Sequence, residues 1–330
     1  MNDTKLNPTN QRLVWVDWMK TLAMYFIITG HCNVPGNKYI YAFSVPCFFV
    51  LSGFLTKRES NPKVFWKKTW WNLVVPMIIL LLIHIAYVCA LDLLQGTFEI
   101  NYLWQCLCNA LIGNQGQDTK GGLGVLWFVY TLIICKAIIQ YTPAAKERFV
   151  LPLLSVSMLV GCYILNGKGV VVYNAIVDVL LAMPFIAVGY FTKPFKGKLT
   201  LLCKKWIPLM FIVGIIGVWF CGSSNDIVYL YSCSYGRNLF YCIIGALCGT
   251  VLLYAISRLA ESYLQRFVNI VGGGTLIILG LHIMVMSIIN MLFPIYGLFK
   301  YGEALIILLL LVPVIVFCKN HFKLLYGAKR

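Results

Sequence analysis

Long runs of hydrophobic residues, separated by short polar segments, follow one another from residue 14 to residue 318. A membrane-spanning helix needs about 20 mostly apolar residues, because the hydrocarbon core of a bilayer is about 30 Å thick. Ten runs meet this requirement, at residues 14–33, 39–56, 72–91, 123–142, 149–166, 174–192, 204–222, 236–257, 272–293 and 302–318. The pattern predicts an all-α, polytopic membrane protein with about ten transmembrane helices, forming a single domain over residues 1–330.

The composition agrees with a membrane protein and excludes several other classes. Hydrophobic residues make up 60% of the chain and charged residues only 12%, which is far from the composition of a soluble globular domain. Disorder, a collagenous repeat and a small disulfide-stapled fold are excluded on the same grounds. The 13 cysteines form no CxxC pair and no Cys/His cluster with zinc spacing, so we expect neither a metal site nor a disulfide framework.

The charge is strongly positive, with 27 Lys and Arg residues against 11 Asp and Glu residues. Membrane topology explains this excess better than nucleic-acid binding does, because cytoplasmic loops are rich in Lys and Arg. With ten helices, 20 of these residues fall on the side that holds both termini, and five fall on the opposite side. We therefore expect both termini in the cytoplasm, contact with anionic membrane lipids there, and no nucleic-acid partner.

The longest connection, residues 92–122, lies on the outer side in this topology. It exceeds the length of a compact turn and contains an apolar stretch at 102–113 that is too short to span a bilayer. We expect this stretch to form an interfacial or re-entrant helix. The outer loop is then either a lid that helps to bind a substrate or a structural plug.

The first predicted helix carries three ionisable residues, Asp17, Lys20 and His31. Such groups inside a span are costly and usually functional. At 100° per residue, Lys20 and His31 are offset by only about 20° and Asp17 by about 60° from Lys20, so all three share one face. About 16 Å of helix axis separates Lys20 from His31. An imidazole there is suited to taking a proton from an alcohol while an ester forms.

A purely structural interpretation of the same residues remains open. Asp17 then pairs with Lys20 near the interface, and His31 caps the outer end of the helix. His282, near the middle of the ninth span, either faces the same cavity or forms a helix-to-helix hydrogen bond. Asp178 and Arg237 lie near the outer ends of their helices, where they contact an acceptor or each other.

A basic cluster and a glycine cluster flank the spans. The cluster at 57–68 includes Arg58, Lys67 and Lys68, which contact lipid headgroups or the phosphates of a polyanionic donor. The triple glycine at 272–274 lacks the strand, the spacing and the lysine of a phosphate-binding loop. We interpret it as a hinge or a close-packing point.

Several segments together resemble the acyltransferase-3 family, and the branch related to fucose 4-O-acetylase most of all. They are the helix-one pattern from Lys20 to His31, AFSVPCFFVLSGFL at 42–55, a basic pair before Pro76, LWFVYTL at 126–132 and GTLIILGLH at 274–282. The similarity extends over about residues 12–318 and includes the ten helices. Lys20 stands at a basic position that is more often Arg in the family, and a lysine offers only a point charge there.

The resemblance implies a bacterial O-acetyltransferase of the cytoplasmic (inner) membrane, with no bound cofactor and with acetyl-CoA as the donor substrate. The acceptor would be a hydroxyl of a surface or exported glycan of the cell envelope, either a polysaccharide or a glycolipid. His31 would be the essential histidine, acting as general base or acyl carrier, with Lys20 and Asp17 on the same face. Acetyl-CoA would bind at Arg58, Lys67 and Lys68 and extend along the helix. Candidates for shaping the acceptor side are Trp127, Asp178, Arg237 and His282.

Two other classes compete with an enzyme. A ten-helix protein with intramembrane Asp, Lys and His residues could be a proton-coupled sugar or glycolipid transporter. A non-catalytic protein that binds lipids through its basic face is the third possibility. Transfer of label from acetyl-CoA distinguishes an enzyme from both.

Overall fold

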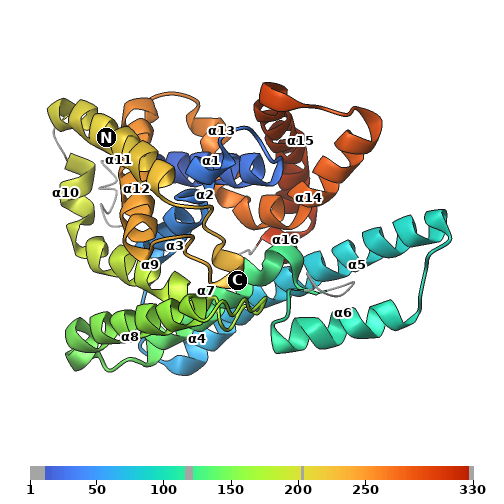
Figure 1. Ribbon diagram of the computed structural model, residues 1–330, viewed down its shortest axis with the longest axis horizontal. Coiled ribbons are helices and arrows are strands. Elements are labelled where there is room, and N and C mark those ends of the chain that lie inside the picture. The colour runs from blue at the N-terminus through green and yellow to red at the C-terminus, as the bar shows by residue number, and fades with distance from the viewer. Residues whose placement is uncertain (1–11, 116–121, 202–203, 327–330) are drawn as a thin grey trace, which may run out of the picture.

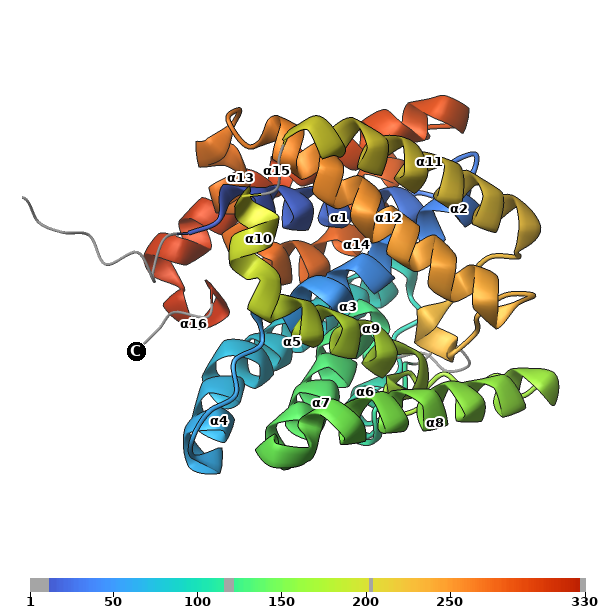
Figure 2. The same cartoon turned by 90° about the vertical axis from the view of Figure 1, so that its left-hand side faces the viewer.

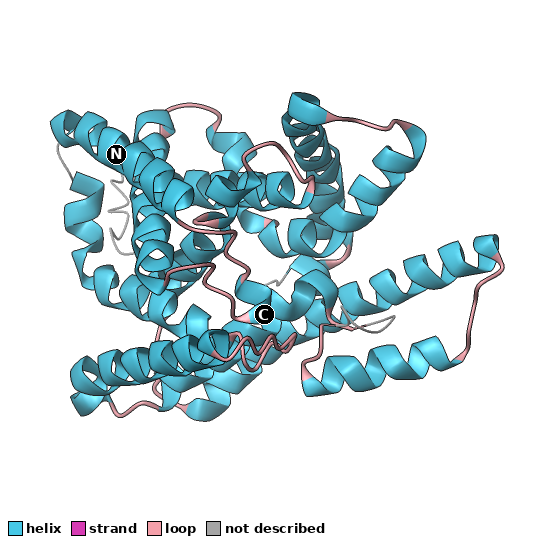
Figure 3. Ribbon diagram, viewed as in Figure 1, coloured by secondary structure: helices cyan, strands magenta, loops and turns pink. Residues whose placement is uncertain are grey.

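The computed structural model describes residues 12–115, 122–201 and 204–326, and this part of the chain is almost entirely helical (Figures 1 and 3). Its longer helices are α1 (Val14–His31), α3 (Ser44–Leu55), α5 (Val75–Gln95), α6 (Asn101–Ile112), α7 (Trp127–Tyr141), α8 (Glu147–Gly167), α9 (Val179–Thr192), α11 (Ile207–Ser224), α12 (Leu239–Ala260), α14 (Thr275–Leu292) and α15 (Lys300–His321). Short helices connect them: α2 (Asn37–Tyr41), α4 (Pro62–Thr69), α10 (Lys196–Leu201), α13 (Gln265–Gly273) and α16 (Lys323–Tyr326). The structure confirms the predicted all-α fold.

Eight helices in the described part of the chain are long and apolar enough to cross a membrane. The two predicted spans that do not qualify are α1 and α9. The 18 residues of α1 include Asp17, Lys20 and His31, which lower its mean hydropathy, and α9 has only 14 residues. The count of ten helices and the cytoplasmic placement of both termini stay predictions.

Two predicted spans are interrupted in the structure. The span at 39–56 divides into α2 and α3 at Ala42 and Phe43. Pro46, which lacks an N–H group, is accommodated in the first turn of α3. The span at 272–293 begins only at Thr275, because the chain turns at Gly274 between α13 and α14.

Helix α1 lies inside the bundle, with α3, α12, α13, α14 and α15 packed around it (Figures 1 and 2). Its buried residues join two hydrophobic clusters, so the polar residues of α1 are held in the centre of the protein. We call its two ends the Lys20 end and the His31 end. The placement of this helix decides where the candidate chemistry takes place.

The outer surfaces of several helices expose large apolar side chains. On α8, the side chains of Phe149, Leu153, Val156 and Val160 are all more than half exposed and recur at helical spacing. Such a continuous apolar face is typical of a helix in contact with lipid. Helices α5 and α6 extend together beyond the rest of the bundle (Figure 1). Helix α6 is the short apolar stretch of the loop 92–122, of which residues 116–121 lie outside the described part.

Candidate active site

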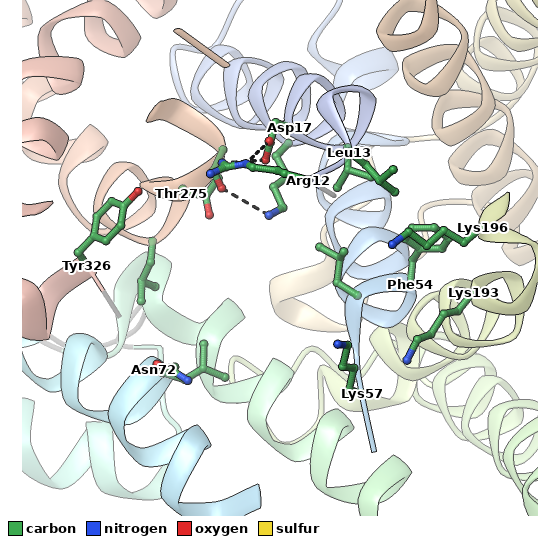
Figure 4. Close-up of a pocket in the computed structure, with 17 residues that line it drawn as sticks. Arg12, Leu13, Asp17, Phe54, Lys57, Asn72, Lys193, Lys196, Thr275 and Tyr326 are labelled. Atoms are coloured by element: carbon green, nitrogen blue, oxygen red, sulfur yellow. Dashed lines mark hydrogen bonds and ion pairs between the residues drawn. The ribbon is translucent and has the colours of Figure 1, made fainter. Parts of the chain in front are cut away.

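A cavity of about 610 Å³ opens at the Lys20 end of α1, and we call it the basic cavity. Its charged lining residues are five cations and one carboxylate: Arg12, Lys20, Lys57, Lys193, Lys196 and Asp17. Figure 4 shows Lys57, Lys193 and Lys196 on one side of the space and Arg12 on another. An excess of positive charge of this kind attracts and concentrates anionic ligands.

The single carboxylate of the cavity is neutralised by a neighbouring guanidinium. Arg12 donates two hydrogen bonds to Asp17, from Nε to Oδ2 at 2.5 Å and from Nη2 to Oδ1 at 3.1 Å. The bond to Asp17 raises the pKa of Arg12 above its ordinary value, although partial burial acts in the opposite direction. Asp17 thus pairs with Arg12, and Lys20 instead donates to the backbone oxygen of Gly272 at 3.4 Å.

The triple glycine lets α13 approach α1 at this point. A Cβ atom on Gly272 would lie 2.7 Å from Oδ1 of Asp17 and 3.2 Å from its Cα. A Cβ atom on Gly274 would lie 2.6 and 2.7 Å from carbons of Ile315. The glycines are therefore a close-packing point, one of the two roles expected from the sequence, and they expose the carbonyl that Lys20 contacts.

Two smaller cavities continue from the basic cavity toward the His31 end. The middle cavity, of about 80 Å³, shares Leu73, Thr275 and Leu276 with the basic cavity. The histidine cavity, of about 30 Å³, shares Ile27, Phe128 and Leu279 with the middle cavity and is lined by His31. From Lys20 onward, the lining residues of α1 are Lys20, Met24, Ile27 and His31 in turn. They recur at steps of three and four residues, which places them on one helix face.

His31 has an aromatic environment. Its ring lies 5.1 Å from the ring of His282 between centroids, and Trp127, Tyr41 and Tyr231 line the same cavity. Tyr229 connects these tyrosines, with centroids 5.5 Å from Tyr41 and 5.3 Å from Tyr231. Two of the predicted acceptor-side residues, Trp127 and His282, thus adjoin His31.

The other two predicted acceptor-side residues lie elsewhere. Asp178 is fully buried and accepts a hydrogen bond from Nε2 of Gln115 at 2.5 Å. Gln115 is held in turn by its backbone N–H, which donates to Tyr173 O at 3.1 Å. Asp178 therefore fixes Gln115, within the loop 92–122, to the bundle. Arg237 is exposed in the turn before α12, and within the described ranges it forms no ion pair with Asp178.

The predicted donor-binding residues do not line the basic cavity. Arg58 pairs with Glu147 at 3.1 Å, and Lys68 pairs with Glu59 at 2.7 Å. Lys67 lies exposed on α4. The residues that line the cavity instead are Lys57, Lys193, Lys196 and Arg12. The sequence did contain a signal for Lys193 and Lys196. Their three-residue spacing places both side chains on one face of a helical turn.

The comparisons with known proteins supply the family. A family profile described as an acyltransferase domain matches residues 13–318, nearly the whole chain. The chain belongs to the acyltransferase-3 family. No curated protein and no solved structure matched it. The protein is thus a multi-pass membrane acyltransferase, an enzyme class that needs a site for an acyl donor and a site for an acceptor.

The arrangement suits acyl transfer between substrates that enter from opposite ends. The acyltransferase has a cationic cavity at one end of α1 and the imidazole of His31 at the other, joined by apolar space. An imidazole can accept a proton from a hydroxyl nucleophile, and a cationic cavity can hold phosphates. Within the described ranges, no three His, Cys, Asp or Glu side chains converge as they would around a metal ion.

Proposed function

We propose that this acyltransferase transfers an acetyl group from cytoplasmic acetyl-CoA to a hydroxyl group of a surface or exported glycan. The observation that carries the proposal is the series of three adjoining cavities along one face of α1, from Lys20 to His31. A donor with a charged head and a thin flexible arm matches this series, since the wide end is cationic and the narrow part is apolar. The Lys20 end then faces the cytoplasm.

The donor phosphates would bind Lys57, Lys193 and Lys196. Ammonium groups bind phosphate oxygens as point charges, and the only carboxylate that lines this cavity among the described residues is already paired with Arg12. The pantetheine arm would pass Met24 and Ile27 in the middle cavity. The thioester carbon would then stop beside His31.

The acceptor would approach from the His31 end. Aromatic side chains surround this end, and an aromatic ring carries negative charge on its face and so attracts the positively polarised C–H groups of a sugar. Tyr41, Tyr231 and Trp127 could contact the edge of a sugar that carries the reacting hydroxyl. The family implies a glycan acceptor, and the ring of tyrosines supports that choice.

His31 would act as the general base. Its ring nitrogen takes the proton from the acceptor hydroxyl while the hydroxyl oxygen forms a bond to the thioester carbon. The tetrahedral intermediate then collapses, the carbon–sulfur bond breaks, and His31 returns the proton to the leaving thiolate. The products are the acetate ester of the glycan and CoA with a free thiol.

The direct test is transfer of labelled acetyl groups by the purified protein in detergent, with a panel of glycans as acceptors. Wild-type protein should transfer label, and His31→Ala should lower kcat by about 100-fold or more, the usual contribution of a general base. His84→Ala is the matched control, because His84 is half-buried on α5 and lines none of the three cavities. A folded His31→Ala variant with the wild-type rate would contradict the assignment. A carrier would move the glycan without modifying it.

A further inference from the structure

His282 has one ring nitrogen engaged and one without a partner. The side chain is fully buried in α14, and its Nδ1 lies 2.9 Å from the backbone oxygen of Ile278. A carbonyl oxygen only accepts hydrogen bonds, so Nδ1 carries the ring proton. In the neutral imidazole, Nε2 then has an unshared electron pair and is a hydrogen-bond acceptor.

Nε2 of His282 has no hydrogen-bond partner among the described residues, although it is buried. A buried polar atom without a partner is costly, and each such atom in a native protein calls for a functional or structural explanation. Because the Nδ1–H tautomer is fixed by Ile278, Nε2 of His282 is always ready to accept a hydrogen bond from a neighbouring N–H group.

The nearest such donor is His31. The ring centroids of the two histidines are 5.1 Å apart and their planes are tilted by 50°. A hydrogen bond of about 2.9 Å between two ring nitrogens, together with the two ring radii, amounts to about 5 Å. The distance therefore suits a shared proton. The rings do not form this bond in the structure, but the half-buried His31 borders free space in which its ring can turn.

We propose that His282 is the positioning residue of His31. Its Nε2 accepts the N–H group of one His31 ring nitrogen, which leaves the other His31 nitrogen unprotonated and directed into the histidine cavity. This inference rests on the proposed function, because it assigns His282 a role in the same reaction. It is the role that a carboxylate has in a Ser-His-Asp triad, filled here by a neutral imidazole.

The proton balance follows from this arrangement. When His31 takes the proton of the acceptor hydroxyl, both of its nitrogens carry protons, and the hydrogen bond to Nε2 of His282 stabilises the positive charge. His282 keeps its own Nδ1 proton throughout, held by Ile278 O. When the carbon–sulfur bond breaks, the thiolate takes one proton from His31 and the original state is restored.

Among the described residues, no carboxylate lines the histidine cavity. Glu303 on α15 lies outside that lining. Its Oε1 accepts a hydrogen bond from Asn290, two turns beyond His282 on α14, and its Oε2 has no partner among the described residues. The other titratable groups on the wall of the histidine cavity are Tyr41 and Tyr231, which both pack against Tyr229. The imidazole of His282 is thus the basic group that faces His31.

Two substitutions at one position separate positioning from packing. Asn in place of His282 keeps an amide donor near the Nδ1 position and loses the acceptor at Nε2, whereas Gln reaches the Nε2 position with an acceptor oxygen. We expect His282→Asn to lower kcat by about 100-fold with little change in the KM for acetyl-CoA. His282→Gln should recover most of that loss. Equal rates for His282→Asn and wild type, or equal losses in both variants, would overturn the proposal.

A spectroscopic measurement on the wild-type protein tests the same point without activity. The chain has only four histidines, so ¹⁵N-labelled histidine gives a spectrum that single substitutions can assign. We expect His282 as the neutral Nδ1–H tautomer, and a shift of the His31 signals in His282→Asn but not in His84→Asn. An Nε2–H tautomer for His282 would refute the positioning role. Wild-type activity in His31→Ala would instead refute the proposed function, so the two failures are distinguishable.

Discussion

Lys193 shows at the scale of one residue how the basic cavity is adapted to an anion. Its Nζ donates to the backbone oxygen of Thr56 at 2.6 Å, which holds the ammonium group at the cavity wall. Burial, and after it the nearby charges of Lys57 and Lys196, lowers the pKa of Lys193 below that of an ordinary lysine. A bound anion would relieve the repulsion among these three cations.

The lowered pKa of Lys193 predicts a pH dependence. A lysine with a lowered pKa loses its charge at a lower pH than other lysines do. The KM for acetyl-CoA should therefore begin to rise at a lower pH than it would if Lys193 had an ordinary pKa. Lys193→Arg, which stays protonated, should remove this alkaline rise. Lys193→Met should raise the KM about 10-fold at neutral pH, the effect of losing one charged contact of about 1.4 kcal/mol.

Steady-state kinetics over a range of pH checks this prediction. Lys63→Met is the control, because Lys63 is exposed on α4 and does not line the cavity. If Lys63→Met and Lys193→Met raise the KM equally, the effect comes from net charge and the contact at Lys193 is refuted.

Sequence reasoning at the residue scale worked where helix geometry alone decides the outcome. The angular offset between Lys20 and His31 predicted a common face, and both residues line the same series of cavities. It could not find the Arg12–Asp17 pair, because Arg12 lies before the helix begins and its direction depends on tertiary packing. The partner of Asp178 is Gln115, which lies in a loop 63 residues away in the sequence. The hydrophobic pattern along the chain cannot predict such a contact.

At the scale of secondary-structure elements, α3 and α9 are in backbone contact through two glycines. A Cβ atom on Gly53 of α3 would lie 2.9 Å from the backbone nitrogen of Tyr190, and one on Gly189 of α9 would lie 2.9 Å from that of Phe54. Small residues permit this close approach of helices inside a membrane. Since α3 leads to Lys57 and α9 leads to Lys193, the contact also holds the two lysines on one side of the basic cavity.

Substitution of either glycine should separate the two helices. Gly53→Ala and Gly189→Ala place a methyl group against backbone atoms that cannot move independently, so we expect each to destabilise the protein by about 3 kcal/mol or more. Gly161→Ala on α8 is the control, because its Cβ would lie 3.7 Å from the side chain of Leu180, an ordinary contact.

Thermal unfolding of the purified variants in detergent measures the difference. The Gly161→Ala protein should unfold within a few degrees of wild type, because its change is of the order of 1 kcal/mol. A Gly53→Ala protein as stable as this control would show that the backbones are not in contact.

Element boundaries were the part of the fold that the hydrophobic pattern predicted least well. Hydropathy averages over a window, so it did not detect the interruption between α2 and α3 or the turn at Gly274. Gly274 is packed against Ile315 of α15, forty-one residues further along the chain.

At the scale of the whole molecule, the cavities connect the two ends of α1 through apolar space. Ile27 lines both the middle cavity and the histidine cavity. It therefore stands where a donor arm would have to pass in order to reach His31. A change in the size of this one side chain tests the route without touching a charged group.

Ile27→Trp should fill this passage and lower kcat/KM for acetyl-CoA by about 100-fold, as misplacement of a reacting group does. Ile27→Ala widens the passage and should keep acetyl transfer within about 10-fold of wild type while admitting longer acyl groups. Competition between acetyl-CoA and longer acyl-CoA donors measures both effects. If both variants lose activity equally and remain folded, the arm does not pass Ile27.

The small volume beside His31 has a consequence for the fate of an activated acyl group. A space of about 30 Å³ holds only one or two water molecules, since a cavity of about 10–15 Å³ already admits one. A bound acceptor hydroxyl would displace these water molecules. The thioester would then be attacked by the hydroxyl and not by water. In the proposed reaction, the narrowness of this chamber would therefore favour transfer to the acceptor over hydrolysis of the donor.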